Sequence, residues 1–221
     1  TLRDHAPGVP RLFTMCVEPA PMPEFYGLVD LWCPVMSLYD PATAPVRQKL
    51  GEKVWWYVCT GPGAPWPNNF IDHAAITHRI RYWIMEKYNV EGDLYWSSTY
   101  WAYKDPWEDP QSYVNRPEGK DPAQVWGNGD GYLFYPPSRE RPKGPLVKGP
   151  CGSIRLALIR AGLEDREYFR AYERRVRDAK GLAGSRAVLD SLVADFTHYE
   201  TAPEKIAAAR DRLAELVESV E

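Results

Sequence analysis

The chain has 221 residues, of which 44% are hydrophobic and 26% are charged, and its net charge is -3. This composition excludes a disordered or fibrous chain and allows one substantial core. With a pI near 5.9, the sequence offers no basic surface for nucleic acid, and no run reaches the ~18 apolar residues of a membrane span. The four cysteines form no CxxC pair, so we interpret them as free thiols and expect no metal site and no cofactor.

Four apolar runs predict four buried strands, at residues 11–17, 29–35, 54–59 and 93–97. The third run is apolar at every position, which is typical of a strand buried on both faces of a parallel sheet. Before the fourth run, apolar residues recur at helical spacing from Ile76 to Ile84 and predict a crossover helix. Such a helix makes the strands that it joins parallel neighbours. We therefore expect an α/β fold, with only a turn or two of helix after the first two strands, near residues 24–26 and 46–50.

Aromatic and amide side chains lie at the ends of the third and fourth predicted strands. The third strand ends before Trp66, Asn68 and Asn69. The fourth ends near Trp96 and is followed by Ser97, Ser98, Tyr100 and Trp101. The carboxyl ends of parallel strands open on one edge of a sheet, where ligands bind. An aromatic face stacks on the C–H face of a sugar while polar groups bind its hydroxyls, so we predict a sugar site on this edge. The alternative is that the tryptophans belong to the core, which suits those inside regular elements: Trp55, Trp56 and Trp83.

Residues 102–150 form a proline-rich excursion with little periodicity and too many aromatic residues for a solvated linker. Its centre, GNGDGYLFYPP, predicts a tight glycine turn that leads into a short extended segment. The glycines could suggest phosphate or calcium binding, but no Lys-Ser/Thr follows them and no ladder of carboxylates accompanies them. We interpret them as turn residues, with Asp130 as a candidate ligand for a hydroxyl group.

The last third of the chain predicts helices. Ser153 is a candidate N-cap for a helix over SIRLALIRAG, and a second helical stretch covers residues 163–179. The apolar face of the first helix would consist of Ile154, Leu158 and Ala161. Four charged residues fit a structural ion network better than catalysis: Arg155, Arg160, Glu164 and Asp165. Residues 185–221 predict two amphipathic helices, split at Thr201-Ala202-Pro203, which would pack onto the rest of the chain.

A series of motifs runs through residues 11–175 in the order VDLWCP, KVWWYVCTGP, PNNFID, HRIRYW, GDLYWSSTYW, NGDGYLFYP and SIRL. Their succession resembles the C-terminal half of the catalytic domain of glycoside hydrolase family 123, which includes retaining N-acetyl-β-galactosaminidases and relatives of unknown function. The family fold is a (β/α)8 barrel, which takes ~250 residues. The resemblance therefore implies that residues 1–180 form half of a TIM-type barrel, with strands five to eight, the long loop 102–150 and the final barrel helix. Residues 181–221 would form a C-terminal helical cap.

The resemblance also implies substrate-assisted catalysis, in which the 2-acetamido oxygen attacks C1 while an Asp-Glu pair orients the acetamide and protonates the leaving oxygen. In the family this pair follows the fourth strand. No Asp-Glu pair follows any of the four strands here, and Glu18-Pro19 only imitates it. We therefore expect the catalytic acids upstream of Thr1. Because the start TLRDHAPGVP looks truncated, the choice between export and the cytoplasm stays open. The exposed sheet edges of a half barrel predict pairing with the missing N-terminal half.

Two functions follow from these observations. The first is a carbohydrate-active glycoside hydrolase domain, an N-acetyl-β-hexosaminidase of the galactosaminidase type, whose substrate-binding residues are Tyr57, Trp66, Asn69, Trp96, Trp101, Asp130 and Tyr135. The second is a non-catalytic carbohydrate-binding or scaffolding relative that has kept the aromatic cleft. A hydrophobic strand ending in Asp-Glu upstream of Thr1 would favour the enzyme.

Overall fold

The computed structural model describes residues 2–15, 22–101, 105–111, 127–137, 147–176 and 179–220. Its strands are β1 (Leu12–Met15), β2 (Leu31–Pro34), β3 (Lys53–Val54), β4 (Trp56–Val58), β5 (Asp93–Tyr95), β6 (Phe134–Tyr135) and β7 (Cys151–Gly152). Its helices are α1 (Leu2–His5), η1 (Pro23–Phe25), η2 (Met36–Leu38), α2 (Ala44–Lys49), α3 (Thr77–Lys87), α4 (Ile154–Arg175), α5 (Ala179–Leu192) and α6 (Pro203–Glu218). The predictions for Glu18-Pro19 and for much of the 102–150 excursion concern residues outside the described ranges.

The four predicted strands are present and parallel, and they neighbour one another in sequence order. The third consists of β3 and β4, on either side of Trp55, and its residues bond alternately to the two neighbouring strands. The Trp55 N–H donates to the Trp32 carbonyl at 2.8 Å, whereas the Trp56 N–H donates to the Gly92 carbonyl at 3.1 Å. A parallel bridge between Val35 and Tyr57 joins the two halves, so β1, β2, β3/β4 and β5 form one continuous layer.

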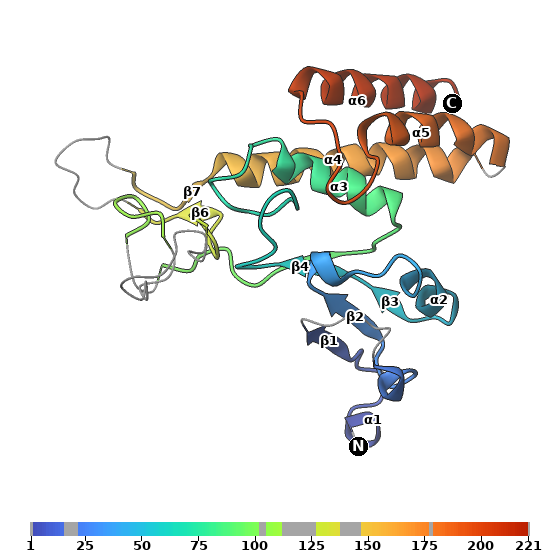
Figure 1. The fold of residues 1–221 in the computed structure, drawn as a ribbon, viewed down its shortest axis with the longest axis horizontal. Coiled ribbons are helices and arrows are strands. Elements are labelled where there is room, and N and C mark those ends of the chain that lie inside the picture. Colours follow the sequence, from blue (N-terminus) through green and yellow to red (C-terminus); the bar gives the residue numbers. More distant parts are fainter. Residues whose placement is uncertain are drawn as a thin grey trace.

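The prediction that the third strand is buried on both faces is wrong. Burial alternates along it: Val54, Trp56 and Val58 are buried, and the residues between them are half-buried. Alternation with a period of two means that one face is covered and the other is partly open. Figure 1 shows the reason, because the helices stack on one side of the strands only.

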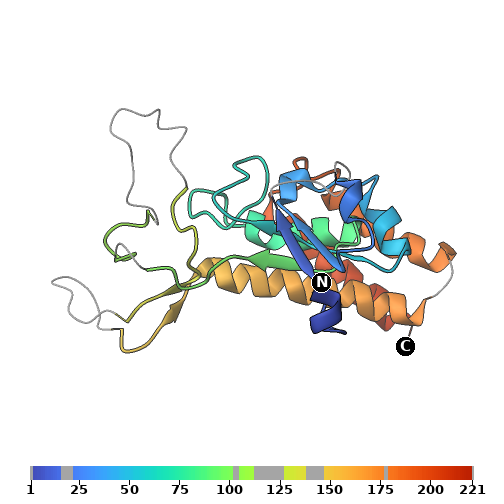
Figure 2. The ribbon, with the colours of Figure 1, turned by 90° about the horizontal axis from the view of Figure 1, so that it is seen from below.

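Helices form two layers on the covered side of the sheet. Helices α3 and α4 lie next to the strands, and α5 and α6 lie outside them (Figures 1 and 2). A single cluster of buried residues runs through these layers, and its largest members include Trp32, Trp56, Ile80, Trp83, Phe169, Leu189, Ile206 and Leu213. The burial predicted for the C-terminal helices is confirmed for Leu189, Leu192, Val193, Ile206 and Leu213, which are all at most 4% exposed, whereas Val217 is half-buried.

Helix α3 lies where the spacing of its apolar residues predicted a helix. Its apolar residues Ile80, Trp83 and Ile84 are buried, and Asn89 ends the helix in the left-handed region, with φ at 50°, where Asn is tolerated. The short turns expected after the first two strands are η1 and α2. Among the described helices, none combines the length and the apolarity needed to cross a membrane.

Helix α4 differs from the prediction in two respects. The two expected helices are one, which starts at the predicted N-cap: the Ser153 hydroxyl accepts from the Leu156 N–H at 3.3 Å. Ile154 is 69% exposed, so it does not belong to the buried face. That face instead consists of Arg155, Gly162, Asp165, Arg166, Phe169 and Tyr172. Its charged residues have partners on distant segments, which the apolar pattern cannot reveal.

Gly162 lets α4 approach α3 closely. A Cβ atom there would lie 2.5 Å from Tyr82 Cδ2 and 2.7 Å from the Arg79 carbonyl oxygen. We expect Gly162→Ala to lower the free energy of unfolding by about 1–3 kcal/mol, because the two helices must separate. Gly184→Ala in α5 is the control, since its Cβ meets nothing closer than 3.4 Å. Chemical denaturation of both variants checks this, and equal stability of the two would contradict it.

Candidate functional site

The glycine turn of the excursion lies against the loop that follows β5. The Tyr100 N–H donates to the Gly131 carbonyl and the Leu133 N–H to the Ser98 carbonyl, both at 2.9 Å. An antiparallel bridge joins Thr99 to Tyr132. Residues far apart in the sequence therefore meet at the carboxyl end of β5, and we call the group formed by Tyr95, Trp96, Tyr100, Asp130 and Gly131 the Asp130 site.

An exposed aromatic ring lies beside a buried carboxylate in the Asp130 site. Asp130 is 0% exposed and Trp96 is 37% exposed. The Asp130 Oδ1 atom accepts hydrogen bonds from the Tyr95 hydroxyl and from the Trp96 indole N–H, both at 3.1 Å. The Tyr100 ring lies 4.8 Å from the Trp96 ring, so a second aromatic group flanks the exposed indole.

Burial raises the pKa of Asp130 above its usual range, while the hydrogen bonds from Trp96 and Tyr95, the Gly131 N–H and the charge of Arg155 act in the opposite direction. Burial also raises the pKa of Tyr95, and the neighbouring Asp130 adds to this effect. The Tyr95 hydroxyl therefore keeps its proton and acts as a donor to the carboxylate. Asp130, a candidate ligand for a hydroxyl group in the sequence, has no exposed surface. In this arrangement it holds the exposed aromatic surface in place.

Gly131 allows the backbone to approach Trp96. Its φ is 80°, in the region that only glycine adopts readily. A Cβ atom at this position would lie 2.4 Å from Trp96 Cζ2. The prediction that these glycines serve turn geometry is confirmed by the turn at 128–131, and the turn also holds the indole in place.

Trp101 and Tyr135 lie on the two segments that carry Trp96 and Asp130. The Trp101 indole N–H donates to the Phe134 carbonyl at 2.9 Å. The Tyr135 ring lies 4.6 Å from the Trp107 ring and 5.3 Å from the Tyr132 ring. Both predicted residues are half-buried.

Asn69 lies beneath this surface and is 1% exposed. Its Oδ1 atom accepts from Arg81 Nη1 at 2.9 Å, and Arg81 Nη2 donates to Asp93 Oδ2 at 2.9 Å. The neighbouring Asn68 holds the same loop through the carbonyls of Cys59 and Pro62. In this position Asn69 supports the loop after β4.

Among the predicted sugar-binding residues, Trp66 differs most from the prediction. Its ring stacks on Phe196, 5.5 Å away between centroids, in the connection between α5 and α6. Tyr88 and Trp56 pack on the same phenylalanine, so Trp66 contributes to the main core. Tyr57 is half-buried and alternates with the buried Trp56 and Val58 along β4, which directs it to the open face of the sheet.

Comparison with known proteins shows the family to which the chain belongs. The sequence model of the glycoside hydrolase 123 catalytic domain matches residues 19–172, which is more than half of the chain. The chain belongs to this family. It is also similar in fold to a solved family 123 glycoside hydrolase from Clostridium perfringens, studied for glycolipid glycan hydrolysis, with a TM-score of 0.62 at 18% identity. The match covers 95% of this chain and 35% of that one. No curated protein sequence matches the chain.

Sequence reasoning missed Tyr95 of the Asp130 site in this glycoside hydrolase 123 chain, because Tyr95 was part of a predicted strand. Tyr100 was expected on the same edge of the sheet but was not among the predicted substrate-binding residues. The motif GDLYWSSTYW contains both, but the hydrogen bond from Tyr95 to Asp130 depends on a segment 35 positions away. Only the turn of the backbone at 128–131 brings these residues together.

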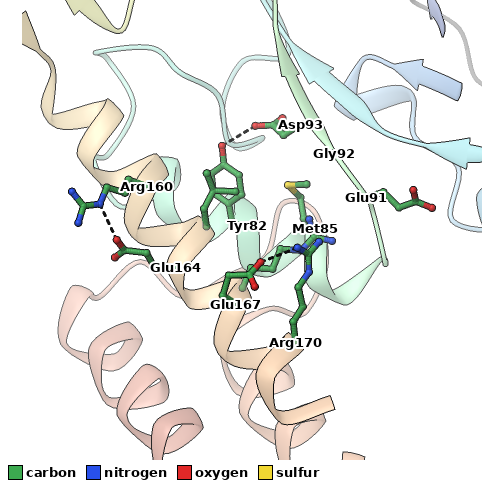
Figure 3. A pocket seen from close by; sticks show the side chains of 11 residues that line it. Tyr82, Met85, Glu91, Gly92, Asp93, Arg160, Glu164, Glu167 and Arg170 are labelled. Carbon is green, nitrogen blue, oxygen red and sulfur yellow. Dashed lines mark hydrogen bonds and ion pairs between the residues drawn. The ribbon is translucent and has the colours of Figure 1, made fainter. Parts of the chain in front are cut away.

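A hollow of about 360 Å³ lies at the opposite end of β5, between α3 and α4 (Figure 3). Its charged residues pair with one another: Arg160 with Glu164, and Arg170 with Glu167. It lies beside Glu91 and Gly92, at the amino end of the strand, whereas barrel enzymes keep their chemistry at the carboxyl end. Within the described ranges, moreover, no group of three His, Cys, Asp or Glu could hold a metal. We therefore place the candidate site of this family 123 chain at Asp130.

Proposed function

We propose that the chain is the sugar-binding part of a glycoside hydrolase catalytic domain. The observation that carries this proposal is the exposed Trp96 indole fixed beside the buried Asp130 carboxylate at the carboxyl end of β5. A ring face stacks on the C–H face of a sugar, and the buried carboxylate fixes the indole through its hydrogen bond. Tyr57, Trp101 and Tyr135 would complete the binding surface.

The half-barrel interpretation is part of the proposal. The four strands are parallel and follow one another in sequence order, as in a singly wound barrel, whereas doubly wound sheets reverse their order. One face of the sheet is partly open, and a hollow of about 570 Å³ at its amino end is lined by residues that include Val9, Leu31 and Trp55. Such a surface fits contact with the other half of the barrel, next to a helical cap over residues 181–221.

The substrate class that we propose is an N-acetyl-β-hexosaminide of the galactosamine type, cleaved with the assistance of its 2-acetamido group. Within this chain, Asp165 of the Glu164-Asp165 pair is bound to Arg79 and Arg210, which suits a structural role. The Asp-Glu pair required for the chemistry is absent from the 221 residues. The chain would therefore supply sugar-binding residues, and the acids would come from elsewhere in the domain.

Replacing Trp96 tests the proposed sugar site. We expect Trp96→Ala to weaken the binding of N-acetylgalactosamine by about 1–3 kcal/mol, because the stacking surface is lost. Trp66→Ala is the matched control: it should leave the affinity unchanged and lower the melting temperature, since Trp66 stacks on Phe196. Isothermal titration calorimetry and thermal unfolding measure the two effects. Unchanged affinity in Trp96→Ala would return this residue to a structural role.

The second candidate function is that of a non-catalytic carbohydrate-binding or scaffolding relative that has kept the aromatic surface. Both functions predict sugar binding, but only the hydrolase predicts release of an aryl group from an aryl N-acetyl-β-galactosaminide by the complete domain. Release by the 221 residues alone would contradict our assignment of the acids to another part of the domain. Binding without release by the complete domain would establish the binding protein.

A further inference from the structure

Arg155 connects the two segments that carry the candidate site. It lies in the first turn of α4 and is 3% exposed. Its Nη1 atom donates to the carbonyl oxygens of Asn69 at 2.6 Å and Gly129 at 2.7 Å, and its Nη2 atom donates to that of Tyr132 at 2.7 Å. One side chain thus binds the loop after β4 and the glycine turn on both sides of Asp130.

The geometry of these contacts requires a guanidinium group. Its donors lie in one rigid plane, so it can serve three carbonyl oxygens at once, whereas the ammonium group of lysine is a compact point charge. Gly129 completes the fit: its φ is 84°, and a Cβ atom there would lie 2.6 Å from Arg155 Nη1. The backbone of the turn can therefore approach the cation only because this residue is glycine.

Asp130 lies between two constrained neighbours. Gly129 contacts Arg155 on one side, and Gly131 contacts the Trp96 indole on the other. A change in the position of the guanidinium would therefore shift the carboxylate and loosen its hydrogen bond to the Trp96 indole N–H. Arg155 also provides a positive charge that favours the ionised form of the buried carboxylate.

We propose that Arg155 is a positioning residue of the sugar site, which fixes Asp130 and Trp96 by binding three main-chain carbonyl groups and touches no substrate itself. This inference rests on the proposed function as far as the sugar is concerned. The positioning of Trp96 by Arg155 does not depend on it, and the two parts can be tested separately.

The first measurement needs no sugar. In a ¹H–¹⁵N spectrum of the 221-residue protein, the Trp96 indole N–H signal, assigned by its loss in Trp96→Phe, reports the hydrogen bond to Asp130. We expect Arg155→Met to shift this signal, Arg155→Lys to shift it less, and the control Arg160→Lys to leave it unchanged, because the Arg160 side chain is 80% exposed. An unmoved Trp96 signal in folded Arg155→Met would overturn the proposal.

The second measurement is the dissociation constant for N-acetylgalactosamine. We expect it to rise about tenfold or more in Arg155→Met with partial rescue in Arg155→Lys, since a misplaced Trp96 indole loses its stacking on the sugar. Equal affinity of Arg155→Met and the wild type would overturn the role in sugar binding. If the wild type binds no sugar, the proposed function fails, while the Trp96 signal still decides the positioning role.

A further variant covers the case in which Arg155→Met does not fold. Gly129→Ala keeps the guanidinium but forces it away from the turn. We expect the Trp96 signal to shift in this variant as well. Gly184→Ala, which has room for its added Cβ, serves as the matched control. An unchanged Trp96 signal in folded Gly129→Ala would contradict the coupling between Arg155 and the Asp130 site.

Discussion

Asp165→Asn should lower the free energy of unfolding by about 3 kcal/mol, because it leaves buried cations without their counter-charge. Asp165 is 0% exposed. Its carboxylate accepts from Arg79 Nε at 2.6 Å, Arg79 Nη2 at 2.8 Å and the Trp83 indole N–H at 2.8 Å. Arg210 of α6 lies 3.2 Å away. The carboxylate thus joins α3, α4 and α6, and the partial exposure of Arg210 keeps the expected loss at the low end for buried pairs.

The adjacent Glu164 provides the control for this substitution. It pairs with Arg160 on the exposed side of α4, where the two side chains are 45% and 80% exposed. Exposed pairs of this kind contribute little to stability, so Glu164→Gln should unfold at the wild-type temperature. The expected loss in Asp165→Asn corresponds to a melting temperature lower by roughly 10 °C for a chain of this length. Similar melting temperatures for the two variants would show that the Asp165 contacts do not stabilise the helix layers.

The stability of the protein should fall as the pH decreases from 6.5 to about 4, and His78 should account for most of that fall. His78 is 1% exposed, and its Nδ1–H donates to the Ala75 carbonyl at 2.9 Å. Burial lowers its pKa from 6.5 to about 4, and the nearby Arg81 and Arg155 cations act in the same direction. The folded state therefore keeps the imidazole neutral where the unfolded chain takes up a proton. The resulting loss is about 3 kcal/mol over this window.

Comparison with His78→Asn isolates this effect. The asparagine amide can still donate to the Ala75 carbonyl, but it does not titrate. We expect denaturation curves measured between pH 7.5 and 4.5 to show a smaller decline for the variant than for the wild type. The pKa of His73 is also lowered by burial, so His73→Asn measures its separate contribution in the same direction. Parallel declines for the wild type and His78→Asn would exclude His78 as the source.

Much of the fold could be predicted from the local pattern of the sequence. The apolar runs gave the parallel strands, the spacing of Ile80, Trp83 and Ile84 gave α3, and Ser153 gave the start of α4. These signals are local, because strand and helix periodicity and capping depend on residues close in the chain. The open face of the sheet could not be predicted. An apolar run that contains a residue such as Trp55 looks the same in the sequence whether or not another element covers that residue.

The candidate site was predicted in part. Trp96 and Asp130 meet as expected, and Trp101 and Tyr135 lie next to them. Trp66 lies in a polar loop that suggested exposure, but Phe196 from the C-terminal connection stacks on it. Buried charges were the other difficulty. Arg155 and Asp165 resemble surface residues in the sequence. Each has a partner 86 positions away, so the neighbouring residues do not indicate that the side chain is buried.

The sequence by itself determined the parallel strands, the position of α3, the start of α4 and the family. It also determined the edge of the sheet that carries aromatic and polar groups, since loops at the carboxyl ends of parallel strands share one edge. Only the tertiary structure decided which of those groups form the site and which form the core. The physical reason is that a hydrogen bond or a ring contact forms only when the fold brings its two partners close together. The glycine turn and Arg155 bring Asp130 to Trp96 across more than thirty positions of the chain.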